Sequence, residues 1–183
     1  MSEMRAESTW WNMLVKGIAI AVPVALIIGG AVGLFLAWNQ ASLPGDPMAQ
    51  RLPDIELETL EGQPMNLQDL AGQPLLLNFW ATWCPPCIEE MPALQEAQLA
   101  YGNNDVLIVA INQGEDRAAV QEFVDRHGMS LLVLLDEQGS ARQYLDVDYL
   151  PTTFFVDSFG VIRSRWESLL EREQMRQGIR ALN

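Results

Sequence analysis

The residue types that build protein metal sites are scarce in this sequence. Only two Cys and one His occur among the 183 residues. Structural zinc takes about four such ligands, so the sequence predicts no metal site, and no pattern in it indicates a bound cofactor. Lysine is missing from residue 39 onward, where nine Arg face 22 Asp and Glu and give a formal charge of 9 − 22 = −13. This acidity argues against a nucleic-acid partner and is typical of a solvated surface.

Charge is absent from residues 17–38, a run of 22 residues. At ~1.5 Å per residue a helix of this length spans ~33 Å, enough to cross the hydrocarbon core of a bilayer. Trp10 and Trp11 before the run and Trp38 at its end suit the two membrane interfaces. A cleaved signal peptide is the alternative, but its apolar core is usually only ~7–15 residues long. We expect residues 17–38 to be an uncleaved transmembrane anchor in the lipid bilayer.

The charges flanking this run indicate its orientation. Arg5 and Lys16 precede it, whereas only Arg51 follows nearby. By the positive-inside rule, residues 1–16 lie in the cytoplasm. Residues 39–51 mix Pro, Gly, Ser, Asp and Gln without periodicity and are interpreted as a tether. The sequence thus predicts a single-pass protein of the cell (inner) membrane, with its larger part on the periplasmic or extracytoplasmic side, where disulfides persist.

Strand and helix patterns alternate along residues 52–183. Strands are expected over residues 54–60, 75–80, 106–111, 131–135, 153–156 and 161–166. Helices are expected over residues 84–101, 116–127 and 140–145, and after a capping box formed by Ser168 and Glu171. This order predicts an α/β domain with a central mixed β-sheet flanked by helices.

Cys84 and Cys87 form a C-x-x-C motif between a buried strand and a helix. Unpaired N–H groups and the helix dipole stabilise a thiolate at the start of a helix. Cys84 is therefore expected to be an exposed nucleophile of low pKa, and Cys87 the resolving thiol. The alternative, a stapling disulfide, is weak because so short a loop adds little stability. The sequence predicts a redox disulfide, Cys84–Cys87.

Two further side chains are candidates for the chemistry of this motif. Glu90 lies three residues after Cys87 on the apolar stripe of the helix, whereas Glu89 lies on the polar side. Burial would raise the pKa of Glu90 and let it pass protons; the alternative is a surface carboxylate. Trp83 is expected at the rim of the site, either packing or contacting substrate.

Four segments resemble the TlpA/ResA/CcmG-type (DsbE-like) membrane-anchored thioredoxin family over residues 52–183. They are Asn78-Phe79-Trp80-Ala81-Thr82, Trp83-Cys84-Pro85-Pro86-Cys87, Glu90-Met91-Pro92 and Leu150-Pro151-Thr152-Thr153-Phe154. The resemblance implies a thioredoxin-like fold behind a transmembrane helix. It also implies an extracytoplasmic thiol–disulfide oxidoreductase that reduces client disulfides, such as those of apocytochrome c, with electrons from a membrane thiol donor of the CcdA/DsbD type.

The resemblance also assigns substrate contacts. Pro151 matches the family's cis-proline, and the backbone of Leu150 would pair with substrate beside Trp83. The family usually has a glycine near the position of Trp166-Glu167-Ser168-Leu169, so a bulkier rim is expected here. Two alternatives stay open: an oxidase or isomerase of secreted proteins, separated from a reductase by its reduction potential, and a module that delivers copper for oxidase assembly.

Overall fold

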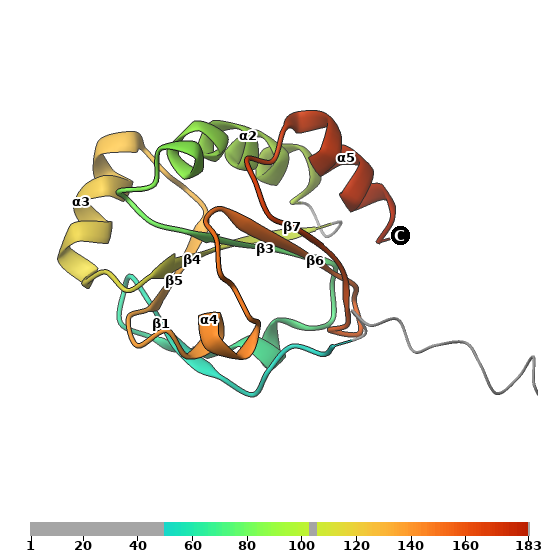
Figure 1. Cartoon of the computed structure of the whole chain (residues 1–183), viewed down its shortest axis with the longest axis horizontal. Helices are drawn as coiled ribbons and strands as arrows, with labels where there is room; N and C mark the ends of the chain where they lie inside the picture. The colour runs from blue at the N-terminus through green and yellow to red at the C-terminus, as the bar shows by residue number, and fades with distance from the viewer. Residues whose placement is uncertain (1–49, 103–105, 183) are drawn as a thin grey trace, which may run out of the picture. The chain divides into compact units, whose positions relative to one another are not determined.

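The computed structural model describes residues 50–102 and 106–182, and its centre is a seven-stranded mixed sheet (Figure 1). The strand order is β2-β1-β5-β4-β3-β6-β7. The strands are β1 (Glu56–Thr59), β2 (Pro64–Asn66), β3 (Leu75–Trp80), β4 (Leu107–Gln113), β5 (Leu132–Asp136), β6 (Thr152–Val156) and β7 (Ile162–Trp166). Strands β3, β4 and β5 are parallel, and the outer strands run antiparallel to their neighbours. The expected mixed sheet is confirmed.

The N-terminal predictions fall largely outside the described residues. The transmembrane anchor at 17–38, the cytoplasmic segment at 1–16 and all of the tether except Gln50 and Arg51 lie in the part of the chain that is not described. Within residues 50–102 and 106–182, no helix combines the length and the apolarity needed to cross a bilayer.

Strand β3 lies near the middle of the sheet and separates two hydrophobic cores. All six of its residues are buried. Successive side chains of a strand point to opposite faces, so Leu76 and Trp80 enter one core while Leu77 and Phe79 enter the other. A strand buried on both faces explains the continuous apolar run that the sequence shows here.

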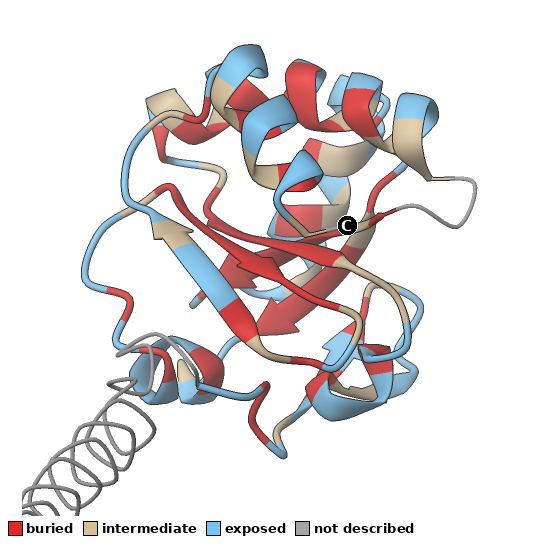
Figure 2. Ribbon diagram, turned by 90° about the vertical axis from the view of Figure 1, so that its right-hand side faces the viewer, coloured by how far each residue is buried: buried red, intermediate tan, exposed pale blue. Residues whose placement is uncertain are grey.

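Helices cover both faces of the sheet (Figure 1). The helices are η1 (Leu67–Leu70, a 3₁₀ helix), α2 (Pro85–Tyr101), α3 (Arg117–His127), α4 (Ser140–Tyr144) and α5 (Arg172–Arg180). Helices α2, α3 and α5 lie along one face, and α4 lies on the other. Figure 2 shows the central strands buried and the outer sides of the helices exposed, which is the pattern of helices that pack on a sheet through one stripe.

Helix α3 shows how local sequence signals fix an element. The Asp116 side chain accepts a hydrogen bond from the Ala119 N–H (2.9 Å) as N-cap, and Gly128 ends the helix with φ 59°. Glycine adopts this left-handed conformation without a Cβ clash. The boundaries expected from the sequence are confirmed to within one residue.

Two details of the predicted elements are wrong. Residues 64–66 form the short strand β2, which is not among the strands expected from the sequence. The capping box at Ser168 and Glu171 is absent, because α5 begins at Arg172 with Glu171 as its N-cap and no side-chain cap bond. Leu170 is 1% exposed and donates its N–H to the Glu90 carboxylate, which keeps the chain extended before the helix.

Candidate active site

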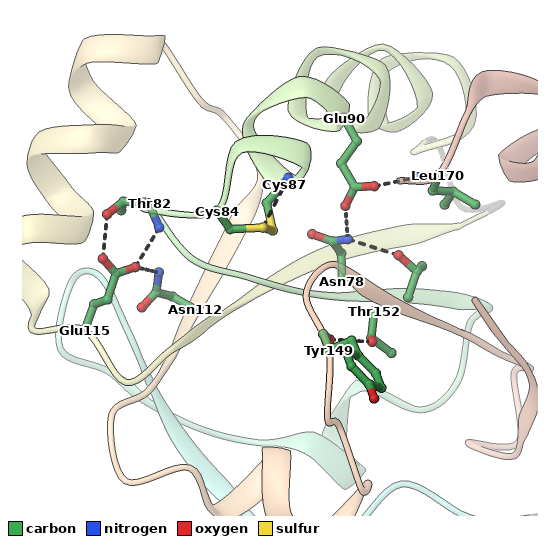
Figure 3. Close-up of a disulfide and its surroundings, with 11 residues drawn as sticks. Asn78, Thr82, Cys84, Cys87, Glu90, Asn112, Glu115, Tyr149, Thr152 and Leu170 are labelled. Atoms are coloured by element: carbon green, nitrogen blue, oxygen red, sulfur yellow. Dashed lines mark hydrogen bonds between the residues drawn. A yellow bond between two sulfur atoms is a disulfide. The ribbon is translucent and has the colours of Figure 1, made fainter. Parts of the chain in front are cut away.

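Cys84 and Cys87 form a disulfide at the N-terminus of α2, with Cα atoms 5.3 Å apart (Figure 3). Cys84 is the N-cap, and its Sγ accepts the Cys87 N–H at 3.3 Å. A sulfur at this position faces the unpaired N–H groups of the first helical turn, which stabilise negative charge. The exposure expected for Cys84 is wrong for this disulfide form: Cys84 is 4% exposed and Cys87 is fully buried. Cys84 is still the more exposed of the two residues.

The two tryptophans before the disulfide have different surroundings. Trp83 is 65% exposed, as expected for a residue at the rim of the site. Trp80 has no exposed surface and packs against Phe123 with ring centroids 5.1 Å apart. Trp80 therefore belongs to the core below the site, and Trp83 alone of the two is available to a partner molecule.

Glu90 lies one helical turn after Cys87 and is 1% exposed, so its expected burial is confirmed (Figure 3). One carboxylate oxygen accepts Asn78 Nδ2 (2.6 Å), and the other accepts the Leu170 N–H (2.7 Å). Burial raises the pKa of Glu90 from 4.5 to about 7, and the two hydrogen bonds lower it only in part. The neighbouring Glu89 is exposed. The carboxyl group beside the thiols is thus poised to bind and release a proton near neutral pH.

Asn78 was not singled out for a role by the sequence, although its position in an apolar run is a signal for a buried polar contact. It has no exposed surface, and its Nδ2 donates both to Glu90 and to Thr153 Oγ1 (3.0 Å). Its Oδ1 has no hydrogen-bond partner. Asn78 therefore links the carboxyl group on α2 to strand β6 through the sheet.

The Leu150–Pro151 peptide bond is cis, which confirms that expectation. Thr152 follows it, pairs with Phe79 of β3 and donates its hydroxyl to the Tyr149 carbonyl (2.7 Å). Because β3 leads into the disulfide and β6 begins at this register, Leu150 and Pro151 lie at the same end of the sheet as the two cysteines.

The bulkier rim expected around residue 166 is present. Trp166 pairs with Thr153 across β6 and β7, is 37% exposed, and donates its indole N–H to the Leu169 carbonyl (3.3 Å). The next residue, Leu170, donates its backbone N–H to the Glu90 carboxylate. The segment after β7 therefore contacts the Glu90 carboxylate through the Leu170 backbone.

The described residues contain no group of three or more His, Cys, Asp and Glu side chains arranged for a metal ion. His127, the one histidine, is the last residue of α3 and stacks on Phe123 with centroids 4.2 Å apart. This ring stacking gives His127 a role in the packing of α3.

Comparison with known proteins gives the chain relatives along most of its length. It is 33% identical over 168 residues to the thioredoxin-like protein YneN of Bacillus subtilis (strain 168), covering 90% of this chain and 97% of that protein. It is 35% identical over 130 residues to the thiol-disulfide oxidoreductase ResA of Geobacillus thermodenitrificans, covering 71% and 75%.

Solved structures share the fold. A secreted Mycobacterium tuberculosis disulfide oxidoreductase homologous to Escherichia coli DsbE matches with a TM-score of 0.64 and 26% identity, covering 70% of this chain and 96% of that one. StoA from Bacillus subtilis matches with a TM-score of 0.60 and 25% identity, covering 69% and 98%. These likenesses confirm the thioredoxin-like fold. The Redoxin family profile matches residues 47–172, more than half of the sequence, and the chain therefore belongs to the Redoxin family.

Proposed function

We propose that this chain is an extracytoplasmic thiol–disulfide oxidoreductase that reduces disulfides of client proteins. The observation that carries the proposal is the Cys84–Cys87 disulfide at the N-terminus of α2, with the buried Glu90 one turn further along. The named activity of the ResA relatives and the family membership support it.

The reaction proceeds by two exchanges. In the dithiol form, the Cys84 thiolate attacks one sulfur of a client disulfide, and the other client sulfur leaves as a thiolate and takes up a proton. The Cys87 thiol then loses its proton and attacks the Cys84 sulfur. The client leaves as a dithiol, and the Cys84–Cys87 disulfide holds the oxidising equivalents, so two electrons have passed to the client.

Glu90 supplies the proton acceptor in the second exchange. Cys87 is fully buried and has no access to bulk water, so its proton needs a nearby base. A carboxyl group with a pKa of about 7 takes up a proton from a thiol, with a usual pKa near 8.5, at modest free-energy cost. After the client leaves, Glu90 is protonated and is reset as the enzyme is reduced again.

Client binding is assigned to the surface around the disulfide. Trp83 offers an exposed aromatic face, and the backbone of Leu150 before Pro151 offers strand-like hydrogen bonds to an extended client segment. Apocytochrome c is the client suggested by the family, and a membrane thiol donor of the CcdA/DsbD type would return electrons to the disulfide.

The reduction potential tests the direction of the reaction. The full-length protein is equilibrated with glutathione or dithiothreitol buffers, and the dithiol fraction is measured by thiol labelling. A value below roughly −220 mV supports a reductant. A value near −120 mV would make the protein an oxidant of secreted proteins and refute the proposed direction.

A trapping experiment identifies the client. The Cys87→Ser variant lacks the resolving thiol, so mixed disulfides with Cys84 accumulate. The Cys84→Ser variant is the matched control, because it keeps one thiol but lacks the proposed nucleophile. Equal trapping by the two variants would remove Cys84 from its role.

We propose further that residues 17–38 anchor the chain in the cell membrane with its folded domain outside. The two cysteines are the only ones in the chain, so thiol labelling reports the side of the membrane directly. A membrane-impermeant maleimide should label the reduced protein in intact spheroplasts, and the protein should sediment with membranes. Labelling only after lysis would contradict the orientation.

A further inference from the structure

Glu115 joins two loops beside the disulfide (Figure 3). It lies between β4 and α3, and its carboxylate accepts the Thr82 N–H (2.7 Å) and the Thr82 hydroxyl (2.5 Å). It also accepts Asn112 Nδ2 (2.7 Å). Thr82 lies only two residues before Cys84, in the loop that presents the nucleophile. Glu115 therefore holds this loop against the end of strand β4.

Both oxygens of the Glu115 side chain act as hydrogen-bond acceptors. In all three bonds, Thr82 or Asn112 can act as the donor. In the view of Figure 3 the disulfide lies between Glu115 and Glu90. Glu90 lies on the side of Cys87, whereas Glu115 contacts the loop that leads into Cys84.

We propose that Glu115 is a positioning residue that sets the acidity of Cys84 and makes the dithiol a stronger reductant. One residue separates Thr82 from Cys84, and two residue steps of extended chain span about 7 Å, so the carboxylate lies on the order of 10 Å from the Cys84 sulfur. A fixed negative charge at that distance disfavours the thiolate, against the helix dipole that favours it. A less stable thiolate makes the dithiol form less stable relative to the disulfide.

This inference rests on the proposed redox role of the two cysteines and adds a residue that tunes it. An isosteric variant, Glu115→Gln, separates charge from geometry. Its amide oxygen can replace Oε2 and keep accepting from the Thr82 N–H and from Asn112 Nδ2, and its Nε2 can replace Oε1 and donate to the Thr82 hydroxyl oxygen.

The experiment measures the pKa of Cys84 in the full-length Cys87→Ser background, from the pH dependence of iodoacetamide alkylation. Coulomb's law at an effective dielectric constant of about 20–80 gives a fall in the Cys84 pKa of about 0.3 to 1 unit in Glu115→Gln. With both cysteines present, the equilibrium with glutathione should move toward the dithiol by about twofold or more.

Two matched variants distinguish an effect of the Glu115 charge from the loss of any surface charge and from the loss of the Thr82 hydroxyl contact. Glu122→Gln removes the same charge from an exposed position on α3 and should leave the Cys84 pKa unchanged. Thr82→Val removes the hydroxyl contact but keeps the charge, and it should also leave the pKa in place. An unchanged pKa in Glu115→Gln, or an equal fall in Thr82→Val, overturns the inference. Alkylation needs no redox partner, so a wild-type protein that fails to exchange with disulfides would refute the proposed function separately.

Discussion

Replacing Glu90 by Gln should change how the stability of the folded protein depends on pH. Burial raises the pKa of Glu90 from 4.5 to about 7. The stability that this group contributes is fully present below pH 4.5, where Glu90 is protonated in both states, and is lost as the pH rises through about 7. The shift of 7 − 4.5 = 2.5 units corresponds to about 3 kcal/mol.

The glutamine side chain in Glu90→Gln is neutral at every pH, so this variant does not lose that stability as the pH rises. Its amide can accept the Leu170 N–H and can donate to Asn78 Oδ1, which has no partner, after the Asn78 amide turns. Relative to wild type, Glu90→Gln should therefore gain about 3 kcal/mol in unfolding free energy between pH 4.5 and pH 8. All other titrating groups are shared by the two proteins and cancel in this difference.

Urea unfolding of the full-length oxidised proteins across this pH range measures the effect. Glu89→Gln is the matched control, since Glu89 precedes Glu90 directly but is exposed, and its stability difference from wild type should stay nearly constant with pH. A difference between Glu90→Gln and wild type that is equally flat would show that Glu90 ionises normally in the folded protein. The proton-transfer role would then lose its basis.

Three other substitutions probe the same face of the sheet. Asn78→Ala removes a hydrogen bond that lowers the pKa of Glu90, so that pKa should rise by roughly 1 unit, as followed by carboxyl NMR titration. Gly178→Ala places a Cβ 2.1 Å from a ring carbon of the buried Phe155, and should destabilise the protein by roughly 1–3 kcal/mol in urea unfolding. Leu94→Ala opens a cavity at a fully buried position and should lower the thermal unfolding midpoint, with a loss of roughly 2–5 kcal/mol. A loss below 0.5 kcal/mol for either core variant would contradict the packing.

The sequence predicts elements best where local pattern and tertiary packing agree. Strand β3 and the N-terminal end of α2 lie where the apolar run and the cysteine motif place them. Strand β4 ends two residues later than predicted, because Asn112 and Gln113 are polar yet buried. Strand β2 has only three residues and pairs with β1, so no periodic pattern marks it.

The candidate site was predictable where its residues are close in sequence. Cys84, Cys87 and Glu90 share one helix, and helical periodicity is enough to bury Glu90. Glu115 is 33 residues from Thr82, and only the pairing of β3 with β4 brings the two loops together. A carboxylate just after a buried strand is the signal that could have marked it, because the carboxyl ends of parallel strands meet at one edge of a sheet.

Strand β3 separates the core that contains the redox centre from a second core that does not contain it. Both cysteines and Trp80 belong to the core under α2, while Leu77 and Phe79 belong to the core under α4. Substitutions in the second core can change melting temperature without touching a residue of the redox centre. The α4 side is therefore the place to engineer a more robust protein, and the α2 side the place to alter its redox behaviour.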